Sequence, residues 1–267
     1  MAHREPGELL GQRSPARRLA VFSHPAHELA VWGLMQRLRP YALYLTDGGS
    51  GARGRDTRAG LKSIGLMERA RFLDYSEESF YAALLARDAA FYSRVADAIR
   101  REIEAVQAEQ VLCDAVEFYN PLHDMALPLV LAALAGRNDV AVFEIPIVYQ
   151  RPEPGEAYEV QRFPDGLAQE QIVLQLTDQE LAAKLRARDE IYGQTCRELG
   201  ALVDIGGAHP AVEVVRPSNG AVPAPDEAAR VLRYERRGRR LQQEGAIAQV
   251  ITYADHYAPL TRLLGVG

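Results

Sequence analysis

Three of the six histidines in this 267-residue sequence have a spacing that suits a metal site. His24 and His27 enclose Pro25 and Ala26, and His123 lies far along the chain. Zinc in hydrolases commonly takes three protein ligands and keeps a fourth position for water, which becomes a nucleophile near neutral pH. A His-x-x-His pair is often incidental, so the residues alone leave two interpretations open: a metal centre, or histidines without a ligand.

The apolar pattern predicts the elements that position these histidines. Short apolar runs typical of strands alternate with segments whose apolar residues recur at helical spacing. The expected strands are 19–23, 41–46, 70–74 and 110–115, and a fifth is expected within 140–149. The expected helices are 28–39, 56–67, one or two between 76 and 108, and 122–135. This alternation predicts an α/β fold with a Rossmann-like, mostly parallel sheet and helices on both faces.

Polar clusters follow three of the expected strands, at residues 24–27, 47–54 and 114–123. In open α/β sheets the ligand crevice lies outside the carboxyl ends of the strands. The three clusters are therefore expected to meet at one edge of the sheet.

The second part of the chain has a different composition. Residues 151–166 are rich in Pro, Gly and Glu, and 171–176 are expected to form a strand. Thr177 and Glu180 form a capping box that opens a helix reaching about residue 199. Residues 202–225 are expected to be rich in loops.

Three parts are expected along the chain: a flexible N-terminal arm over 1–16, a Rossmann-type domain over 17–200, and a C-terminal extension over 201–267 packed on the same domain. The extension is expected to contain a helix over 226–243. Its arginines within 233–240 are interspersed with other polar residues, glutamate among them. That pattern favours a solvated helix face or a contact in a homo-oligomer over a nucleic-acid site.

Composition excludes several classes of protein. With 48% apolar and 25% charged residues the chain is typical of a globular protein. The net charge of −5 disfavours nucleic acid as a partner. The sequence has no apolar run of about 18 residues and no signal-peptide pattern, and two cysteines cannot form a disulfide framework. We therefore expect a soluble cytoplasmic protein with a polar small-molecule partner and no membrane partner.

Three sequence blocks, in this order, resemble one known family. Ser23-His-Pro-Ala-His-Glu28 resembles the His-Pro-Asp-Asp-Glu signature of the LmbE-like, or PIG-L, family, and Leu45-Thr-Asp-Gly48 resembles the segment at that family's second strand. Tyr119-Asn-Pro-Leu-His-Asp124 resembles its downstream His-Pro-Asp-His motif. The resemblance covers about residues 18–195. It implies a Rossmann-like fold and zinc-dependent N-deacetylase activity on N-acetylglucosaminyl-type substrates.

The resemblance also implies roles for individual residues. The family's first and last zinc ligands correspond to His24 and His123, and its second ligand, an aspartate, corresponds to His27. The family's general base, another aspartate, corresponds to Ala26, which cannot accept a proton. The first histidine of the downstream motif, which helps to stabilise the oxyanion, corresponds to Asn120, whose amide can donate a hydrogen bond.

A replacement for the missing base is expected nearby. Loss of a general base costs about 10²–10⁴-fold in rate unless another group takes its place. Asp114 and Glu117 are the preferred candidates, because both follow the fourth expected strand and should face the crevice. The alternative role for such a carboxylate is to orient a histidine ligand by accepting a hydrogen bond from its ring N–H.

Residues 48–54 are expected to form a Gly-rich loop that contacts substrate, with arginines that can hold a phosphate or carboxylate. The expected substrate-binding residues are Asp47, Arg53, Arg55, Arg58 and Tyr119. Gly49-Ser-Gly-Ala-Arg-Gly54 also fits G-x-G-x-x-G, and Asp74 ends the next expected strand. This match leaves a dinucleotide-binding interpretation open.

Two functions follow as hypotheses. The first is a hydrolase of amide (N-acyl) bonds that uses zinc or another divalent metal, acting as an N-deacetylase on an amino-sugar-like molecule such as an N-acetylated sugar. The alternative is a non-hydrolytic protein of the same fold that binds a sugar or nucleotide. Ala26, at the position of the usual catalytic aspartate, favours the alternative.

Overall fold

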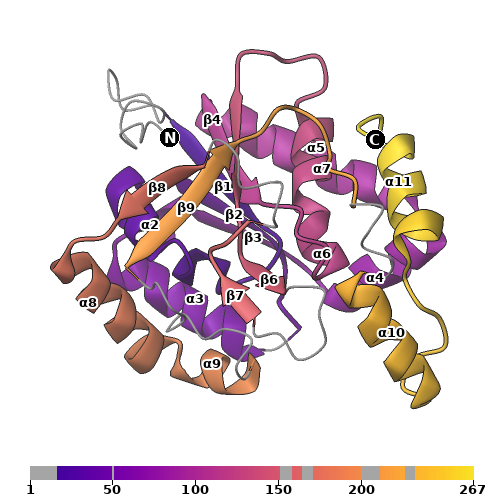
Figure 1. The fold of residues 1–267 in the computed structure, drawn as a ribbon. Helices are drawn as coiled ribbons and strands as arrows, with labels where there is room; N and C mark the ends of the chain where they lie inside the picture. Colours follow the sequence, from indigo (N-terminus) through magenta and orange to yellow (C-terminus); the bar gives the residue numbers. More distant parts are fainter. Residues whose placement is uncertain (1–16, 50, 151–157, 164–170, 200–210, 226–231) are drawn as a thin grey trace.

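The computed structural model describes residues 17–49, 51–150, 158–163, 171–199, 211–225 and 232–267. Within these ranges a seven-stranded sheet has the order β3-β2-β1-β4-β5-β9-β8 (Figure 1). Its strands are β1 (Arg18–Phe22), β2 (Tyr41–Thr46), β3 (Ala70–Tyr75), β4 (Gln110–Asp114), β5 (Ala141–Ile145), β8 (Ile172–Gln175) and β9 (Val212–Pro217). The first five strands are mutually parallel, and β9 runs antiparallel to both β5 and β8. The predicted mostly parallel α/β fold is confirmed.

Helices cover both faces of the sheet, because alternate side chains of each buried strand point to opposite faces (Figure 1). Leu19 and Val21 of β1 face one core, which includes side chains of α4 (Glu77–Ala86), α5 (Ala89–Val106), α6 (Pro121–Asp124), α7 (Ala126–Ala133) and α11 (Ala258–Leu263). Ala20 and Phe22 face the other core, which includes side chains of α2 (Trp32–Leu38), α3 (Gly51–Ser63) and α8 (Asp178–Arg186). Helix α9 (Gly193–Leu199) contacts α3.

The helix expected over 28–39 is divided in the structure. A 3₁₀ turn spans His27–Leu29, Val31 is not helical, and α2 begins at Trp32. The carboxylate of Glu213, on β9, accepts hydrogen bonds from the backbone N–H groups of Gly33 and Leu34. These N–H groups lie in the first turn of α2, so a distant strand caps this helix.

The loop expected over residues 48–54 is shorter in the structure. Gly48 and Gly49 have φ values of 77° and 69°, which complete the turn after β2. Helix α3 then begins at Gly51, five residues before its predicted start. Residues 51–54, expected as part of the loop, are therefore helical.

The rest of the chain departs from the prediction at several points. The segment 140–149, expected to contain one strand, contains β5 and the start of β6 (Val148–Gln150) on either side of Pro146, and β6 pairs with β7 (Tyr158–Val160). Strand β9 lies in a segment expected to be loop-rich. Helix α10 spans Arg233–Gln243 and a π-helical turn spans Tyr253–Tyr257.

Some expectations lie outside the described residues: the N-terminal arm over 1–16, most of the segment 151–166, and the start of the helix expected over 226–243. The capping box of α8 is confirmed, because Thr177 and Glu180 exchange side-chain to backbone hydrogen bonds. In the described ranges, no helix is long and apolar enough to cross a membrane.

Candidate functional site

The structure brings together the three predicted metal ligands. The ring centres of His24 and His27 are 5.2 Å apart, those of His24 and His123 are 5.0 Å apart, and those of His27 and His123 are 4.4 Å apart. All three side chains are buried, at 1%, 5% and 5% exposure. We call these three residues the histidine cluster.

The topology of the sheet explains this convergence. From β1 the chain builds the sheet in one direction through β2 and β3, and then in the other through β4 and β5. The point of reversal lies between β1 and β4, which is where open α/β sheets bind ligands. His24 and His27 follow β1, and His123 lies in α6, which follows β4. The ends of the two strands are tied together, because the backbone N–H and hydroxyl of Ser23 both donate to Asp114 Oδ2, at 2.7 and 2.5 Å.

His24 is held by its Nδ1 atom. This nitrogen lies 2.8 Å from Thr46 Oγ1 and 3.0 Å from Glu77 Oε1. The Thr46 hydroxyl donates its own hydrogen to the carbonyl of Ser23, so its oxygen accepts from His24. The Nδ1 atom of His24 therefore carries the proton, and its Nε2 atom presents a lone pair. That Nε2 atom is buried and has no hydrogen-bond partner among the described residues.

His27 is held in the same way by Asp114. Its Nδ1 atom lies 2.8 Å from Asp114 Oδ2, so the Nδ1–H group donates a hydrogen bond to the carboxylate and the lone pair is on Nε2. Metal-binding histidines commonly have a carboxylate partner of this kind, which fixes the tautomer and the orientation of the ring. The other carboxylate oxygen of Asp114, Oδ1, is buried without a hydrogen-bond partner among the described residues.

His123 lies beside Glu117, with 3.7 Å between His123 Nδ1 and Glu117 Oε2. The two oxygens of Glu117 accept hydrogen bonds from the backbone N–H groups of Ile147 and Val148, at 2.5 and 3.1 Å. Asp124 closes the loop before α6, because its Oδ1 atom accepts from the N–H groups of Glu117 and Phe118. These bonds fix the loop that carries His123.

Asn120 begins helix α6. Its Oδ1 atom accepts from the backbone N–H of Leu122 at 2.9 Å and from the hydroxyl of Tyr81 at 3.3 Å. Pro121 follows at the first helical position, which suits a residue without an N–H. Because Oδ1 is used within the protein, the amide nitrogen is the end of Asn120 that can donate to a substrate.

Burial favours the neutral forms of His24 and His123. It lowers the pKa of His24 and of His123 well below the usual value, and the positive charge of Arg53 acts in the same direction. Burial raises the pKa of Glu117 well above its usual value and that of Asp124 to about 7. Neutral imidazole is the form that binds a metal ion.

The ring-centre distances in the histidine cluster can be compared with those of a zinc site. Tetrahedral coordination at about 2.0–2.1 Å places imidazole ring centres about 5 Å apart, close to two of the three distances observed. Among the residues that the structure describes, however, no group of three His, Cys, Asp or Glu side chains is placed so that it could hold a metal ion as it stands. The rings instead pack edge to face, at interplanar angles of 84°, 64° and 78°. The three rings must therefore rotate before one nitrogen atom of each can point to a shared ion.

Glu77 is a site residue that the sequence reasoning missed. It begins α4 directly after β3, and its Oε1 atom lies 3.0 Å from His24 Nδ1 and 3.4 Å from a guanidinium nitrogen of Arg53. In the sequence Glu77 is indistinguishable from any acidic residue that favours the first turn of a helix. The only sequence signal for a role of Glu77 in the site was its position after β3, the strand that pairs with β2.

The predicted substrate-binding residues have different environments. Arg53 is buried and donates to the backbone carbonyls of Pro25 and Gly48, so it joins the two loops behind the histidine cluster. Asp47 Oδ1 accepts from the N–H groups of Gly49 and Glu77.

Tyr119 is adjacent to the histidine cluster, with its ring centre 6.1 Å from that of His123. The structure does not bring Arg55 or Arg58 to the cluster. Arg55 donates to Gln194 on α9, and Arg58 lies over the ring of Phe72.

The surroundings of the Gly-rich turn disfavour a dinucleotide. A Cβ atom added at Gly49 would lie 3.0 Å from a carboxylate oxygen of Glu77. Asp47 contacts the same turn, so two carboxylates stand where a pyrophosphate would have to approach. Asp74, the expected ribose ligand, lies 3.5 Å from Arg58 in an exposed ion pair.

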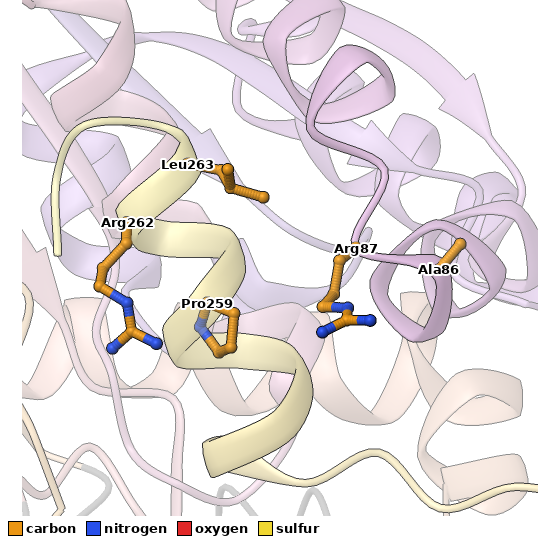
Figure 2. Close-up of a pocket in the computed structure, with 5 residues that line it drawn as sticks. All are labelled: Ala86, Arg87, Pro259, Arg262 and Leu263. Atoms are coloured by element: carbon orange, nitrogen blue, oxygen red, sulfur yellow. The ribbon is translucent and has the colours of Figure 1, made fainter.

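A cavity of about 500 Å³ lies apart from the histidine cluster. Its lining residues come from the end of α4 and from α11 (Figure 2): Ala86, Arg87, Pro259, Arg262 and Leu263. Glu77, which contacts the cluster, is at the opposite end of α4, about 15 Å away along a helix of this length. The cavity is therefore not part of the site at the switch point.

Comparison with known proteins adds support for the fold. No protein-family model and no curated protein matches the sequence. The A40926 pseudoaglycone deacetylase matches in structure with a TM-score of 0.53 and 15% sequence identity, over 76% of this chain and 97% of that one. A triple mutant of a deacetylase from the teicoplanin biosynthetic pathway matches with a TM-score of 0.49 and 15% identity, over 77% of this chain and all of that one. This chain therefore has the α/β fold of a solved deacetylase structure.

Proposed function

We propose that this protein is a zinc-dependent hydrolase of amide (N-acyl) bonds, an N-deacetylase of an amino-sugar-like small molecule related to the LmbE-like family. The observation that carries the proposal is the convergence of three buried histidines at the switch point of the sheet. Two of them have Nδ1 held by an acceptor, which leaves Nε2 available as a ligand atom. The fold shared with a solved deacetylase agrees with this function.

His24, His27 and His123 would hold the zinc ion. When bound, zinc polarises an acyl carbonyl and lowers the pKa of a water molecule toward 7. Thr46, Glu77 and Asp114 do not contact the ion in this proposal. They keep the rings of His24 and His27 in the tautomer and orientation that binding needs.

Asp114 is the residue best placed to replace the missing base at Ala26. Its Oδ2 atom accepts from Ser23 and His27, whereas its Oδ1 atom has no partner among the described residues. In the proposed reaction Oδ1 takes a proton from the water that attacks the acyl carbon. The proton then passes to the amine nitrogen as the C–N bond breaks. Glu117 uses both oxygens on backbone N–H groups, which suits a positioning role toward His123.

Asn120 is the proposed oxyanion donor. Its Oδ1 atom is engaged by Leu122 and Tyr81, so its amide nitrogen is free to face the acyl oxygen as negative charge develops there. Burial raises the pKa of Tyr81 to about 12, so this hydroxyl remains protonated and continues to donate to Asn120. Tyr81 is therefore a positioning residue for Asn120.

The test is release of acetate from N-acetylglucosamine by the zinc-loaded protein. We expect hydrolysis by the wild type and a loss of about 10²–10⁴-fold in Asp114→Asn, the range for removal of a general base. Zinc content is measured in both proteins, because Asp114 also orients His27. A wild type that binds zinc stoichiometrically but hydrolyses no N-acyl sugar would contradict the hydrolase.

The second candidate function is non-hydrolytic binding of the same kind of ligand. It is favoured by Ala26, which packs with Leu29 and Trp32 in an apolar cluster and has no proton-accepting group. Sugar binding without turnover, in both the wild type and Asp114→Asn, would support this function over the hydrolase.

A further inference from the structure

Helix α10 and the segment after it pack on the loop that carries His123. The hydroxyl of Tyr257 donates to the backbone carbonyl of Asp124 at 2.7 Å, and the rings of Tyr253 and Phe118 are 6.3 Å apart. The backbone N–H of Tyr253 in turn donates to Glu235 of α10 at 2.9 Å. These contacts place α10 beside α6 and the start of α4 (Figure 1).

Two arginines of α10, Arg233 and Arg237, lie one turn apart on the same face of the helix. The guanidinium of Arg233 lies over the ring of Tyr119, 5.7 Å from its centre, and that ring is 6.1 Å from the ring of His123. Arg237 is one helical turn further along and is exposed. Its positive charge acts on Glu77 and Tyr81: burial raises the pKa of both groups, and Arg237 acts in the opposite direction. Arg237 therefore lies near the residues that contact His24 and Asn120.

Arg237 differs from two other arginines of α10 in its ion pairing. Arg239 pairs with Glu235 within the helix, and Arg240 pairs with Glu244, the residue that follows the helix. In the part of the chain that the structure describes, Arg237 has no acidic partner in an ion pair, although it is surrounded on α10 by arginines. A guanidinium in this position can bind a phosphate or carboxylate through two parallel hydrogen bonds.

We propose that Arg233 and Arg237 bind an anionic group of the substrate, so that the preferred substrate is an N-acylated amino sugar that carries a phosphate or a carboxylate. This inference rests on the proposed function for the identity of the scissile bond. Tyr119 lies between Arg233 and His123. In this proposal it contacts the part of the sugar that connects the anionic group to the acyl group. A neutral sugar would leave Arg237 without a counter-charge among the described residues.

The experiment compares three sugars: N-acetylglucosamine, N-acetylglucosamine 6-phosphate and N-acetylmuramic acid. Acetate release by the zinc-loaded protein gives kcat/KM, and calorimetry gives the affinity of each sugar independently of turnover. The variant is Arg233→Gln with Arg237→Gln, and the matched control is Arg240→Gln on the same helix. We expect one or both anionic sugars to be preferred by about 10-fold or more, the effect of one charged hydrogen bond.

In the double variant we expect kcat/KM and affinity for the preferred anionic sugar to fall by about 10–100-fold, with the neutral sugar changed by less than about twofold. The phosphate and carboxylate sugars show which anion is recognised. Weaker binding at higher salt concentration would agree with binding by the exposed Arg237.

The outcomes separate this inference from the proposed function. Anionic sugars that bind through the two arginines but are not hydrolysed would support the inference and contradict the hydrolase. Hydrolysis of all three sugars at equal kcat/KM, unchanged in the double variant, would support the hydrolase and overturn the inference. Binding of none of the three sugars would also overturn it, as would an equal loss in Arg240→Gln.

Discussion

Two buried polar clusters in this molecule differ in how completely their atoms are paired. Lys184 and Glu213 are 1% and 0% exposed and lie 2.9 Å apart. Lys184 also donates to the carbonyl of Ala30, and Glu213 accepts from the N–H groups of Gly33 and Leu34. Both oxygens of Glu213 have partners, and the ammonium has two acceptors. This cluster joins β9 and α8 to the start of α2.

The histidine cluster is equally buried but is not complete. His24 Nε2, His123 Nδ1 and Asp114 Oδ1 have no hydrogen-bond partner among the described residues. Burying polar atoms without partners costs about 1–3 kcal/mol each. Such a cost is typical of a functional site, where a ligand supplies the missing interactions. The comparison supports our proposal that the histidine cluster binds a ligand, whereas the Lys184–Glu213 pair maintains the fold.

The largest expected effect comes from breaking the complete cluster. Glu213→Ala leaves a buried ammonium and removes the acceptor for two backbone N–H groups, so we expect the free energy of unfolding to fall by about 3–5 kcal/mol. Denaturant unfolding measures this loss. Glu244→Ala, which removes an exposed pair with Arg240, is the control and should cost less than about 1 kcal/mol. Equal losses in the two variants would remove the distinction on which the comparison depends.

A smaller effect is expected from a neighbour of the histidine cluster. Glu77→Gln replaces the charged oxygen 3.0 Å from His24 Nδ1 by a neutral group. We expect zinc affinity to fall by about 10–100-fold, as for other partners of metal-binding histidines, with little change in the stability of the metal-free protein. Competition with a chelator measures the affinity. Glu78→Gln, at the adjacent exposed position, should leave it unchanged. If both variants bind zinc as the wild type does, Glu77 does not position His24.

The smallest effect is a pH dependence of the metal-free protein. Burial lowers the pKa of His123 in the folded state, whereas the unfolded chain has the usual value of about 6.5. Below about pH 6.5 the unfolded state therefore binds more protons, and this histidine lowers stability as the pH falls. The expected slope is up to about 1.4 kcal/mol per pH unit.

His123→Leu isolates this contribution. The raised pKa values of Glu117 and Asp124 act in the opposite sense, but they occur in both proteins and cancel to first order in the difference. We expect the stability of the variant to rise relative to the wild type between pH 7 and pH 5, as measured by urea unfolding in chelator. A difference that does not change with pH would show that the pKa of His123 is the same in the folded and unfolded states.

The sequence predicted the parts of the molecule that depend on local pattern. Strand β2 was predicted with its exact bounds, and the histidine cluster was predicted because parallel strands end at one edge of a sheet. Strand β9 was missed because it ends at a proline, and because its pairing with β5 and β8 depends on residues far along the chain.

The remaining differences also depend on distant contacts. Helix α2 begins at Trp32 because Glu213 supplies its cap from another strand. Glu77 reaches His24 only because β3 pairs with β2, and Arg53 is buried because two loops supply carbonyl acceptors for it. None of these contacts has a signal in the spacing of nearby residues.

The most direct test of the account is the zinc content of the purified protein, measured by elemental analysis after zinc is supplied and excess metal is removed. We predict about one zinc ion per chain in the wild type and none in His123→Ala. His256→Ala is the control and should retain the metal, because His256 lies outside the histidine cluster, where its Nδ1 atom accepts a hydrogen bond from the backbone N–H of Thr252. A wild type without zinc, or a His123→Ala variant that retains it, would contradict the assignment of the histidine cluster as a metal centre.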